Sequence, residues 1–183
     1  MSPYSPAPKI RQRLLLASPS LRDGTFRKSV ILVGEHSADE GAFGLILNHP
    51  SGRTVGDLLP SGELSALAQL PVHLGGPVAR HKLSFAAFHE NGRKLAFELR
   101  IPVEEALARM TQPGTLVRAF AGSSGWSPNQ LEDELEGESW TLVDPPADLL
   151  HLAPDLTLWK TLMRRLSPYH RILADAPDEL LAN

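Results

Sequence analysis

Runs of apolar residues separated by short polar turns recur along the chain and predict a strand-rich fold. Segment 28–36 has an apolar centre from Val30 to Val33, as expected for a strand covered on both faces. Segment 41–49 is a second such run, and the polar stretch 37–41 between them ends in glycine. This pattern predicts a hairpin of two buried strands. Further strands are expected at 71–74, 82–89, 94–100, 115–121 and 139–144.

Helix signals mark two other segments. In 101–114, Pro102 stands in the first turn, two glutamates follow it, and Pro-Gly follows the last turn. In 155–166, Asp155 is the expected N-cap, and leucine, tryptophan and methionine recur on one helical face. A shorter helical turn is expected after Thr54 as its cap. Because strands and helices alternate without a repeating βαβ order, we expect an α+β domain with a mixed or antiparallel sheet.

The stretch AGSSGWSPNQLEDELEG, residues 121–137, resembles the surroundings of a catalytic serine. A nucleophile elbow requires Gly-x-Ser-x-Gly, with glycines four residues apart. Gly122 and Gly125 are three apart, so neither Ser123 nor Ser124 has the required spacing. We therefore interpret this stretch as the start of a helix.

The residues after the glycines support that interpretation. Ser127 is the expected N-cap, Pro128 the first helical residue, and Gln130 has the spacing of a capping box. Acidic residues then follow in the early turns, and Gly137 is expected to end the helix. Backbone N–H groups at such a start either bind an anion or are satisfied by the Ser127 side chain. The nearby acids favour the second alternative.

The composition excludes several classes of chemistry. A chain of 183 residues with 42% apolar content suits one domain with its own core. The absence of cysteine excludes thiol nucleophiles, CxxC redox chemistry and cysteine-ligated zinc. The seven histidines show no HxxxH or HxH spacing, and His36 and His49 are expected at opposite ends of the hairpin. We expect neither a metal site nor a cofactor.

Charge and hydropathy narrow the class of partner. The net charge is −3, and the basic residues occur singly or in pairs such as Arg27–Lys28, so direct nucleic-acid binding is not expected. The opening residues lack the apolar segment of a secretion signal, and no more than four apolar residues follow one another anywhere. We expect no membrane span and a cytoplasmic location. Residues 1–9, with three prolines, are expected to be a flexible tail before a domain at 10–183.

A few polar residues at strand ends are candidates for chemistry. Glu35 and His36 either orient each other for acid–base work or form a polar strand end. Asn48 either binds a ligand through its amide or caps backbone groups. Arg27 and Lys28 either bind an anion or form a solvated strand entry.

The turn LGGPV, residues 74–78, contains two adjacent glycines. Gly75 and Gly76 permit a positive φ or the close approach of another backbone. The turn lacks the helix and the downstream acid of a dinucleotide-binding fingerprint, and no Walker motif occurs in the chain.

Several separated motifs together resemble the AlgH family of bacterial proteins. They cover about residues 14–166 and occur in the family's order: LLLASPSLRDGTFRKSVILVGEHSADEGAFGLILNHP (14–50), VHLGGPV (72–78), AGSSGWSPNQLEDEL (121–135), SW (139–140) and LW (158–159). The resemblance implies one α+β domain whose bifurcated sheet wraps into a pseudo-barrel with helices outside. It implies no established enzymatic activity and no DNA-binding motif, although members carry transcriptional-regulator labels.

The chain departs from the family pattern at a few positions. The family favours arginine where Lys28 stands and often has arginine where His49 stands, so a shared anion site is weakened here. Family glycines are replaced by Ser127 and Asn129, which suits a capped helix start.

Two main hypotheses follow. The first is a non-enzymatic binding or regulatory protein that uses a surface around 24–28, 48–50, 75–77 and 122–130 to bind a protein partner or a small molecule. Trp126 and Gln130 belong to this candidate surface. The alternative is a hydrolase that uses Glu35 and His36. Direct DNA binding is a third hypothesis, disfavoured by the acidic balance of the chain.

Overall fold

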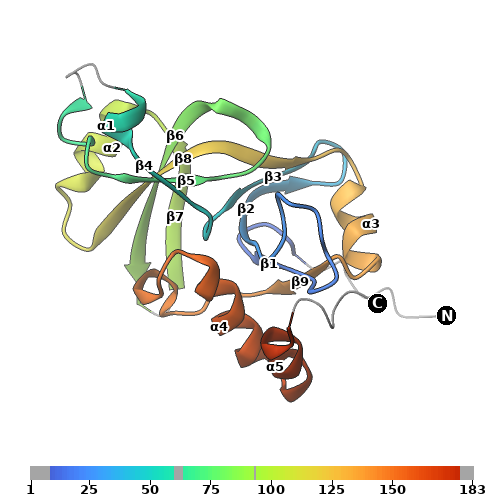
Figure 1. Ribbon diagram of the computed structural model, residues 1–183. Helices are drawn as coiled ribbons and strands as arrows, with labels where there is room; N and C mark the ends of the chain where they lie inside the picture. The colour runs from blue at the N-terminus through green and yellow to red at the C-terminus, as the bar shows by residue number, and fades with distance from the viewer. Residues whose placement is uncertain (1–8, 60–63, 93, 178–183) are drawn as a thin grey trace.

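The apolar runs form the middle of one curled sheet with helices on its outside, shown in Figure 1 for a computed structural model that describes residues 9–59, 64–92 and 94–177. The strands are β1 (Leu14–Ala17), β2 (Val30–Ser37), β3 (Gly41–Ile46), β4 (Pro50–Thr54), β5 (Pro71–Leu74), β6 (Val78–Asn91), β7 (Lys94–Ile101), β8 (Thr115–Trp126) and β9 (Trp140–Val143). The helices are α1 (Val55–Leu58), α2 (Val103–Met110), α3 (Gln130–Glu136), α4 (Leu156–Leu166) and α5 (Pro168–Asp175), with a 3₁₀ turn at Leu149–His151. Most of the expected tail, residues 1–9, lies outside the described residues.

The sheet divides at β8, which crosses the upper part of the molecule in Figure 1 and leads to α3. The first part of β8 pairs with β5 in parallel and with β6 in antiparallel orientation. Its last part pairs with β3, with Ala42 opposite Trp126. From β3 the sheet continues through β2 and β1 to β9. One long strand therefore belongs to both halves of a mixed sheet, and the expected α+β fold with a bifurcated sheet is confirmed.

The strands β1, β2 and β3 are buried on both faces because their alternate residues enter different cores. Leu14 and Leu16 pack into the core beneath α4 and α5, whereas Leu15 packs into the core beside α3. The register of β1 against β2, with Leu15 opposite Ile31, keeps each face continuous. Continuous apolar runs are therefore required here rather than alternation. The predicted hairpin of β2 and β3 is confirmed.

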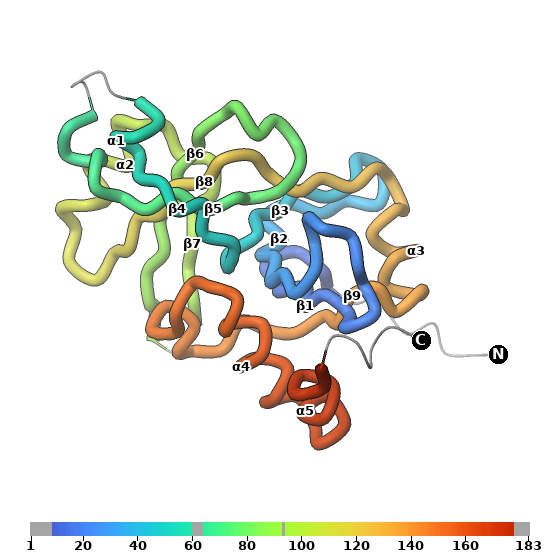
Figure 2. Tube along the Cα trace, in the orientation of Figure 1, coloured from blue at the N-terminus to red at the C-terminus, as the bar shows by residue number. Residues whose placement is uncertain are grey.

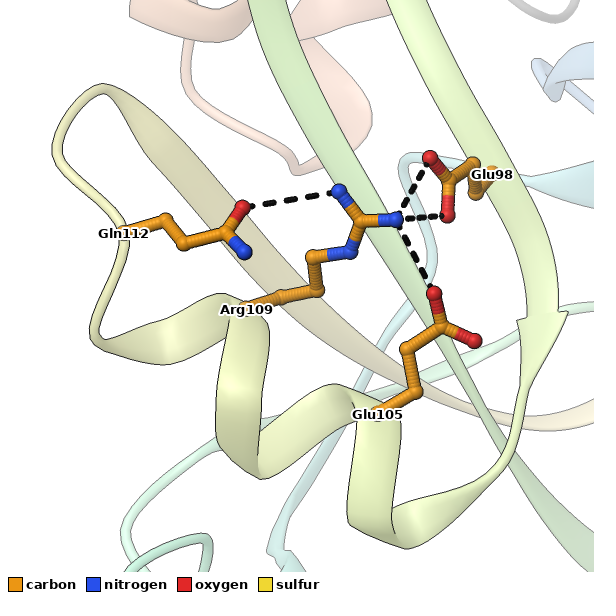
Figure 3. A network of polar contacts seen from close by, with 4 residues as sticks. All are labelled: Glu98, Glu105, Arg109 and Gln112. Atoms are coloured by element: carbon orange, nitrogen blue, oxygen red, sulfur yellow. Dashed lines mark hydrogen bonds and ion pairs between the residues drawn. The ribbon is translucent and has the colours of Figure 1, made fainter.

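A third core lies between α1, α2 and the β5–β6–β8 half of the sheet. Arg109 fastens α2 to β7 at its edge (Figure 3). Its Nη2 atom lies 2.6 Å from Glu98 Oε2 and 2.9 Å from Glu105 Oε1, and Nη1 donates to Gln112. Glu105, and then Glu98, raise the pKa of the Arg109 guanidinium.

The expected helix caps at Thr54 and Asp155 are confirmed. The Thr54 side chain accepts from the Asp57 N–H and Asp57 accepts from the Thr54 N–H, which forms a capping box. The Asp155 carboxylate accepts from the Thr157 N–H. Helix α2 begins at Val103 with Pro102 as its cap residue, and Gly137 ends α3 as expected.

The start of α3 differs from the prediction. The helix begins at Gln130, and its cap residue is Asn129, which has a φ of 65° and makes no side-chain cap. Only half of the expected capping box forms. The Gln130 side chain accepts from the Ser127 N–H at 3.0 Å, but the Gln130 N–H donates to the Ser127 carbonyl and not to the Ser127 side chain. The Ser127 side chain was therefore wrongly predicted as the N-cap.

Five other elements differ from the expected pattern. Strands β1 and β4 and helix α5 were not predicted, and β6 begins four residues earlier than expected. Strand β8 does not end at 121 but continues through Gly122 and Ser124 to Trp126. Its extra length arises because β3 supplies a second partner where β5 ends.

Glycines allow two backbones to cross at this division of the sheet. A Cβ on Gly76 would lie 2.3 Å from the Ser123 backbone, and one on Gly75 would lie 2.4 Å from the Gly122 carbonyl oxygen. Gly75 also donates its N–H to Ala121, and its carbonyl accepts from the Ser124 hydroxyl at 3.1 Å. The expectation that these glycines permit close backbone approach is confirmed.

Replacing Gly76 with alanine should destabilise the protein by more than about 2 kcal/mol, because the new methyl group meets backbone and the φ of 148° disfavours any side chain. Urea unfolding followed by circular dichroism would measure this loss. Gly24→Ala is the matched control, since a Cβ there has no atom within 4 Å. Equal stabilities of the two variants would contradict the crossing as described.

Candidate functional site

A groove opens where the two halves of the sheet separate, and we call it the fork groove. It has a volume of about 450 Å³. Its lining combines apolar side chains, two cationic side chains and the backbone of β8: Phe43, Val78, Ala79, Lys82, Leu83, Ser84, Arg100, Gly122, Ser123, Ser124 and Gly125. Residues 79–82 bulge out of β6, because β6 pairs with β8 at Val78 and again only at Leu83. Figure 2 shows this segment as a wide loop beside β8.

Two residues that line the fork groove have strained backbone. Ala79 has a φ of 50° and Arg100 a φ of 56°, both in the left-handed region that L-residues rarely adopt. Gly122, with a φ of 73°, lies on the opposite wall. Such conformations persist only where the surrounding structure enforces them, and they are common at ligand sites.

Arg100 is fixed above the groove by two contacts. Its guanidinium carbon lies 4.0 Å from the centre of the Phe43 ring, and its Nη2 atom pairs with the Glu35 carboxylate. Because Arg100 ends β7 whereas Glu35 and Phe43 belong to the β2–β3 hairpin, this stack closes the gap between the two halves of the sheet.

Glu35 and His36 are used by different partners. Glu35 pairs with Arg100, whereas His36 Nε2 lies 2.7 Å from Glu132 Oε1 on α3. Both line a second hollow of about 430 Å³ that shares Phe43 with the fork groove. The strand thus presents them as two separate bridges, one to β7 and one to α3.

Trp126 lies in the core rather than on the surface, with 7% of its area exposed. Its indole packs edge-on against Trp140. Both indole N–H groups donate to the same oxygen, Glu134 Oε2, at 2.8 and 2.7 Å. Gln130 donates to the other carboxylate oxygen at 2.9 Å. Trp126 and Gln130 therefore attach α3 to the end of β8.

Asn48 is fully buried and both ends of its amide are bonded to strand backbone. Its Oδ1 accepts from the Val30 N–H at 2.8 Å, and its Nδ2 donates to the Lys28 carbonyl at 2.9 Å. These bonds connect the loop after β3 with the start of β2. Of the two roles considered for Asn48, the structure shows backbone capping.

Arg27 and Lys28 line a separate hollow of about 490 Å³ beside α4 and α5. The Lys28 ammonium lies 5.7 Å from the centre of a Trp159 ring, and Lys160 lies on the same wall.

The candidate residues from the sequence lie in three different places. Glu35 and His36 lie near the fork groove, Gly75 and Gly76 are buried behind it, and Arg27 and Lys28 lie in this separate hollow.

The residues that form most of the groove were not predicted. They come from separate parts of the sequence: Phe43, Val78, Lys82 and Arg100. The positive φ of Arg100 cannot be recognised from the sequence. One signal was present: the polar run from Arg80 to Lys82 interrupts a strand pattern, as a bulge does.

His49, just before β4, and His73, within β5, each have ring atoms shielded from solvent. Burial lowers the pKa of His49, although a bond to the Arg27 backbone opposes this effect. Burial also lowers the pKa of His73, and the charge of Arg118 lowers it further. One ring nitrogen of each, His49 Nε2 and His73 Nδ1, is buried without a hydrogen-bond partner.

Within the described ranges, no three side chains of histidine, aspartate or glutamate are grouped as a metal would require. In the same residues, no helix has the length and apolar content needed to cross a bilayer.

Replacing Glu134 with alanine should destabilise the protein by about 2–3 kcal/mol, because two buried indole N–H groups lose their acceptor. Glu134→Gln should cost less, since an amide oxygen remains available. Chemical denaturation would compare both with Glu136→Ala, an exposed acid on the same helix. The shared-acceptor role is wrong if the alanine and glutamine variants lose the same stability.

The free energy of unfolding should fall as the pH is lowered from 7.5 towards 5.5. Both His49 and His73 have lowered pKa values when folded, so below about pH 6.5 the unfolded chain binds more protons than the native chain. The double variant His49→Gln/His73→Gln should show a shallower dependence over this range. Urea unfolding at each pH measures it, and an unchanged slope would refute the assignment to these two residues.

Comparison with known proteins finds a matching family model and many relatives of this chain. The family model described as AlgH-like matches residues 14–170. A UPF0301 protein of Mycolicibacterium vanbaalenii is 35% identical over 185 aligned positions, covering 93% of this chain and 89% of the relative. A UPF0301 protein of Cytophaga hutchinsonii is 32% identical, covering 90% of this chain and 94% of the relative.

Two solved structures share the fold. A crystal structure of a Corynebacterium diphtheriae protein superposes with a TM-score of 0.73 at 23% identity, covering 93% of this chain and 94% of that one. The solution structure of AlgH from Pseudomonas aeruginosa gives a TM-score of 0.65 at 26% identity, covering 97% and 99%. Since the family model spans nearly all of the described residues and relatives above 30% identity cover the chain almost completely, this chain belongs to the AlgH-like family.

Proposed function

We propose that this chain is a cytoplasmic, non-enzymatic binding or regulatory protein whose ligand lies in the fork groove. The observation that carries the proposal is the groove itself, an apolar floor between two cationic side chains at the point where the sheet divides. Small-molecule sites have this character: about 300–1,000 Å³, mostly apolar walls and a few polar groups that orient the ligand.

The contacts of the groove suggest the class of ligand. Phe43, Val78 and Leu83 supply apolar surface, and 49% of Val78 is exposed. Lys82 supplies positive charge at the rim, and Arg100, which already pairs with Glu35, adds further N–H donors. An apolar molecule or peptide segment that carries one carboxylate or phosphate group complements this arrangement, since its charge meets the cations while its body covers the apolar floor.

The placement of the candidate catalytic groups favours binding over hydrolysis. Glu35 and His36 face different partners, and the Ser124 hydroxyl donates to the Gly75 carbonyl in a buried position. A nucleophile needs a neighbouring base within hydrogen-bond reach. These groups instead hold elements of the fold together. This arrangement suits a protein that binds a ligand and then interacts with a partner, rather than an enzyme.

The test is a thermal-shift screen of the purified protein against apolar carboxylates, acyl phosphates and phosphorylated metabolites. A ligand at one hundred times its dissociation constant should add about 2.7 kcal/mol of stability. Lys82→Glu should weaken the response at least tenfold by reversing charge at the rim. Lys94→Glu, an exposed lysine at the far end of β7, is the matched control and should respond as the unmodified chain does.

A response that is equal in both variants would place the ligand elsewhere. Turnover of an ester or phosphoester panel that disappears in His36→Ala, with stability unchanged, would favour the hydrolase alternative instead.

A further inference from the structure

Arg118 is a largely buried arginine that forms no ion pair with another described residue. It lies in the middle of β8, opposite Ala86, and only 9% of the residue is exposed. Among residues 9–59, 64–92 and 94–177, no carboxylate lies within ion-pair distance of its guanidinium. The contrast with Arg109 is clear, since that arginine lies nearer the surface and contacts two carboxylates.

The surroundings of Arg118 compensate its charge poorly. Its guanidinium carbon lies 5.6 Å from the centre of the Phe88 ring, a cation–π contact. Phe88 and Phe120 on the same face belong to the main apolar core. A buried cation in a folded protein is normally paired with an anion, because removing it from water costs far more than a stacked ring returns. Arg118 is therefore a candidate to bind an anion.

His73 lies beside Arg118 on the same face of the sheet. The parallel register sets His73 opposite Phe120, two residues beyond Arg118, and their rings are 5.9 Å apart. Residues two apart on a strand share a face and lie about 7 Å from each other. The electrostatic influence of Arg118 on His73 is consistent with this proximity.

The hydrogen bond of His73 fixes which nitrogen carries its proton. His73 Nε2 lies 3.2 Å from the Pro154 carbonyl oxygen, which can only accept, so Nε2 carries the hydrogen. His73 Nδ1 is then an acceptor, and it is buried without a partner. A complementary group must donate a hydrogen bond to Nδ1 while presenting negative charge to Arg118.

We propose that Arg118 and His73 form a binding site for free inorganic phosphate in its monohydrogen form. Two anionic oxygens would accept from the guanidinium, and the P–OH group would donate to His73 Nδ1. Sulfate has similar shape and charge but carries no proton at neutral pH, so this site should discriminate against it. The proposal does not depend on the fork groove, whose lining includes neither residue.

The first experiment is a titration of the full chain with potassium phosphate or potassium sulfate at pH 7.5, with ionic strength held constant by chloride. Thermal unfolding should rise saturably with phosphate, and sulfate should bind at least tenfold more weakly. Arg118→Met should lose at least tenfold in phosphate affinity. Arg53→Met, which removes an exposed arginine from β4, is the matched control and should keep it.

Equal stabilisation by phosphate and sulfate, unchanged in Arg118→Met, would be a general salt effect and would overturn the proposal. O-Phosphoserine and glycerol phosphate form a second arm. At pH 7.5 these monoesters carry no P–OH, so they should bind at least tenfold more weakly than free phosphate. Binding as tight as that of phosphate would overturn the role of His73 Nδ1.

A measurement on the unmodified chain keeps the test valid if a variant fails to fold. Long-range ¹H–¹⁵N spectra report the Nδ1 shift of each histidine separately. Saturating phosphate should move His73 Nδ1 towards the hydrogen-bonded range and leave the exposed His81 unmoved. No change at His73, with phosphate at a concentration that stabilises the protein, would exclude it as a ligand.

Discussion

The close crossing of two backbones at Gly75–Gly76 and Gly122–Ser123 is the constraint on which the rest of the structure depends. It lets the chain leave β5, pass over β8 and enter β6 without a side chain between them. Since β8 can then continue beyond β5, it reaches β3 and joins the two halves of the sheet. The fork groove exists because the halves separate on one side of this crossing while remaining joined through it.

Polar groups in this fold mostly serve as joints between elements. Glu134 holds two indoles, His36 meets Glu132, and Asn48 connects two strand ends. In each of these contacts the polar atoms have hydrogen-bond partners, as buried polar groups require. Arg118 has no ion-pair partner and His73 Nδ1 no hydrogen-bond partner among the described residues, so we propose this pair as a ligand site rather than another joint. The groove and this pair are therefore two separate opportunities for recognition on one scaffold.

Much of the fold follows from local patterns because local physics determines them. The β2–β3 hairpin is marked by continuous apolar runs, and the caps at Thr54 and Asp155 by residues whose side chains bond nearby backbone. The resemblance of the spaced motifs to the AlgH family added the bifurcated sheet. Strand β1 has only four residues, and its burial depends on β9 more than one hundred residues away, so no local pattern identified it.

The candidate site was harder to predict because its members meet only in the folded chain. Gly75 and Gly76 were correctly tied to close backbone approach, since a residue without a Cβ permits such contact. Ser127 failed as a cap because the Asn129 backbone turns left-handed first. Arg118 gave no signal, since an arginine between apolar residues of a strand reads as an ordinary alternation.

The pairing of β1 with β9 also has a consequence for biosynthesis. Leu14 lies opposite Val143, and the Trp159 indole donates to the Ala17 carbonyl. The first strand therefore cannot complete its contacts until the last quarter of the chain is present. During translation its four apolar residues remain without their outer partner until most of the protein has left the ribosome. Folds with such distant contacts form slowly and expose apolar segments on the way. This protein should accordingly acquire its native state after synthesis rather than during it, with its earliest strand among the last to be covered.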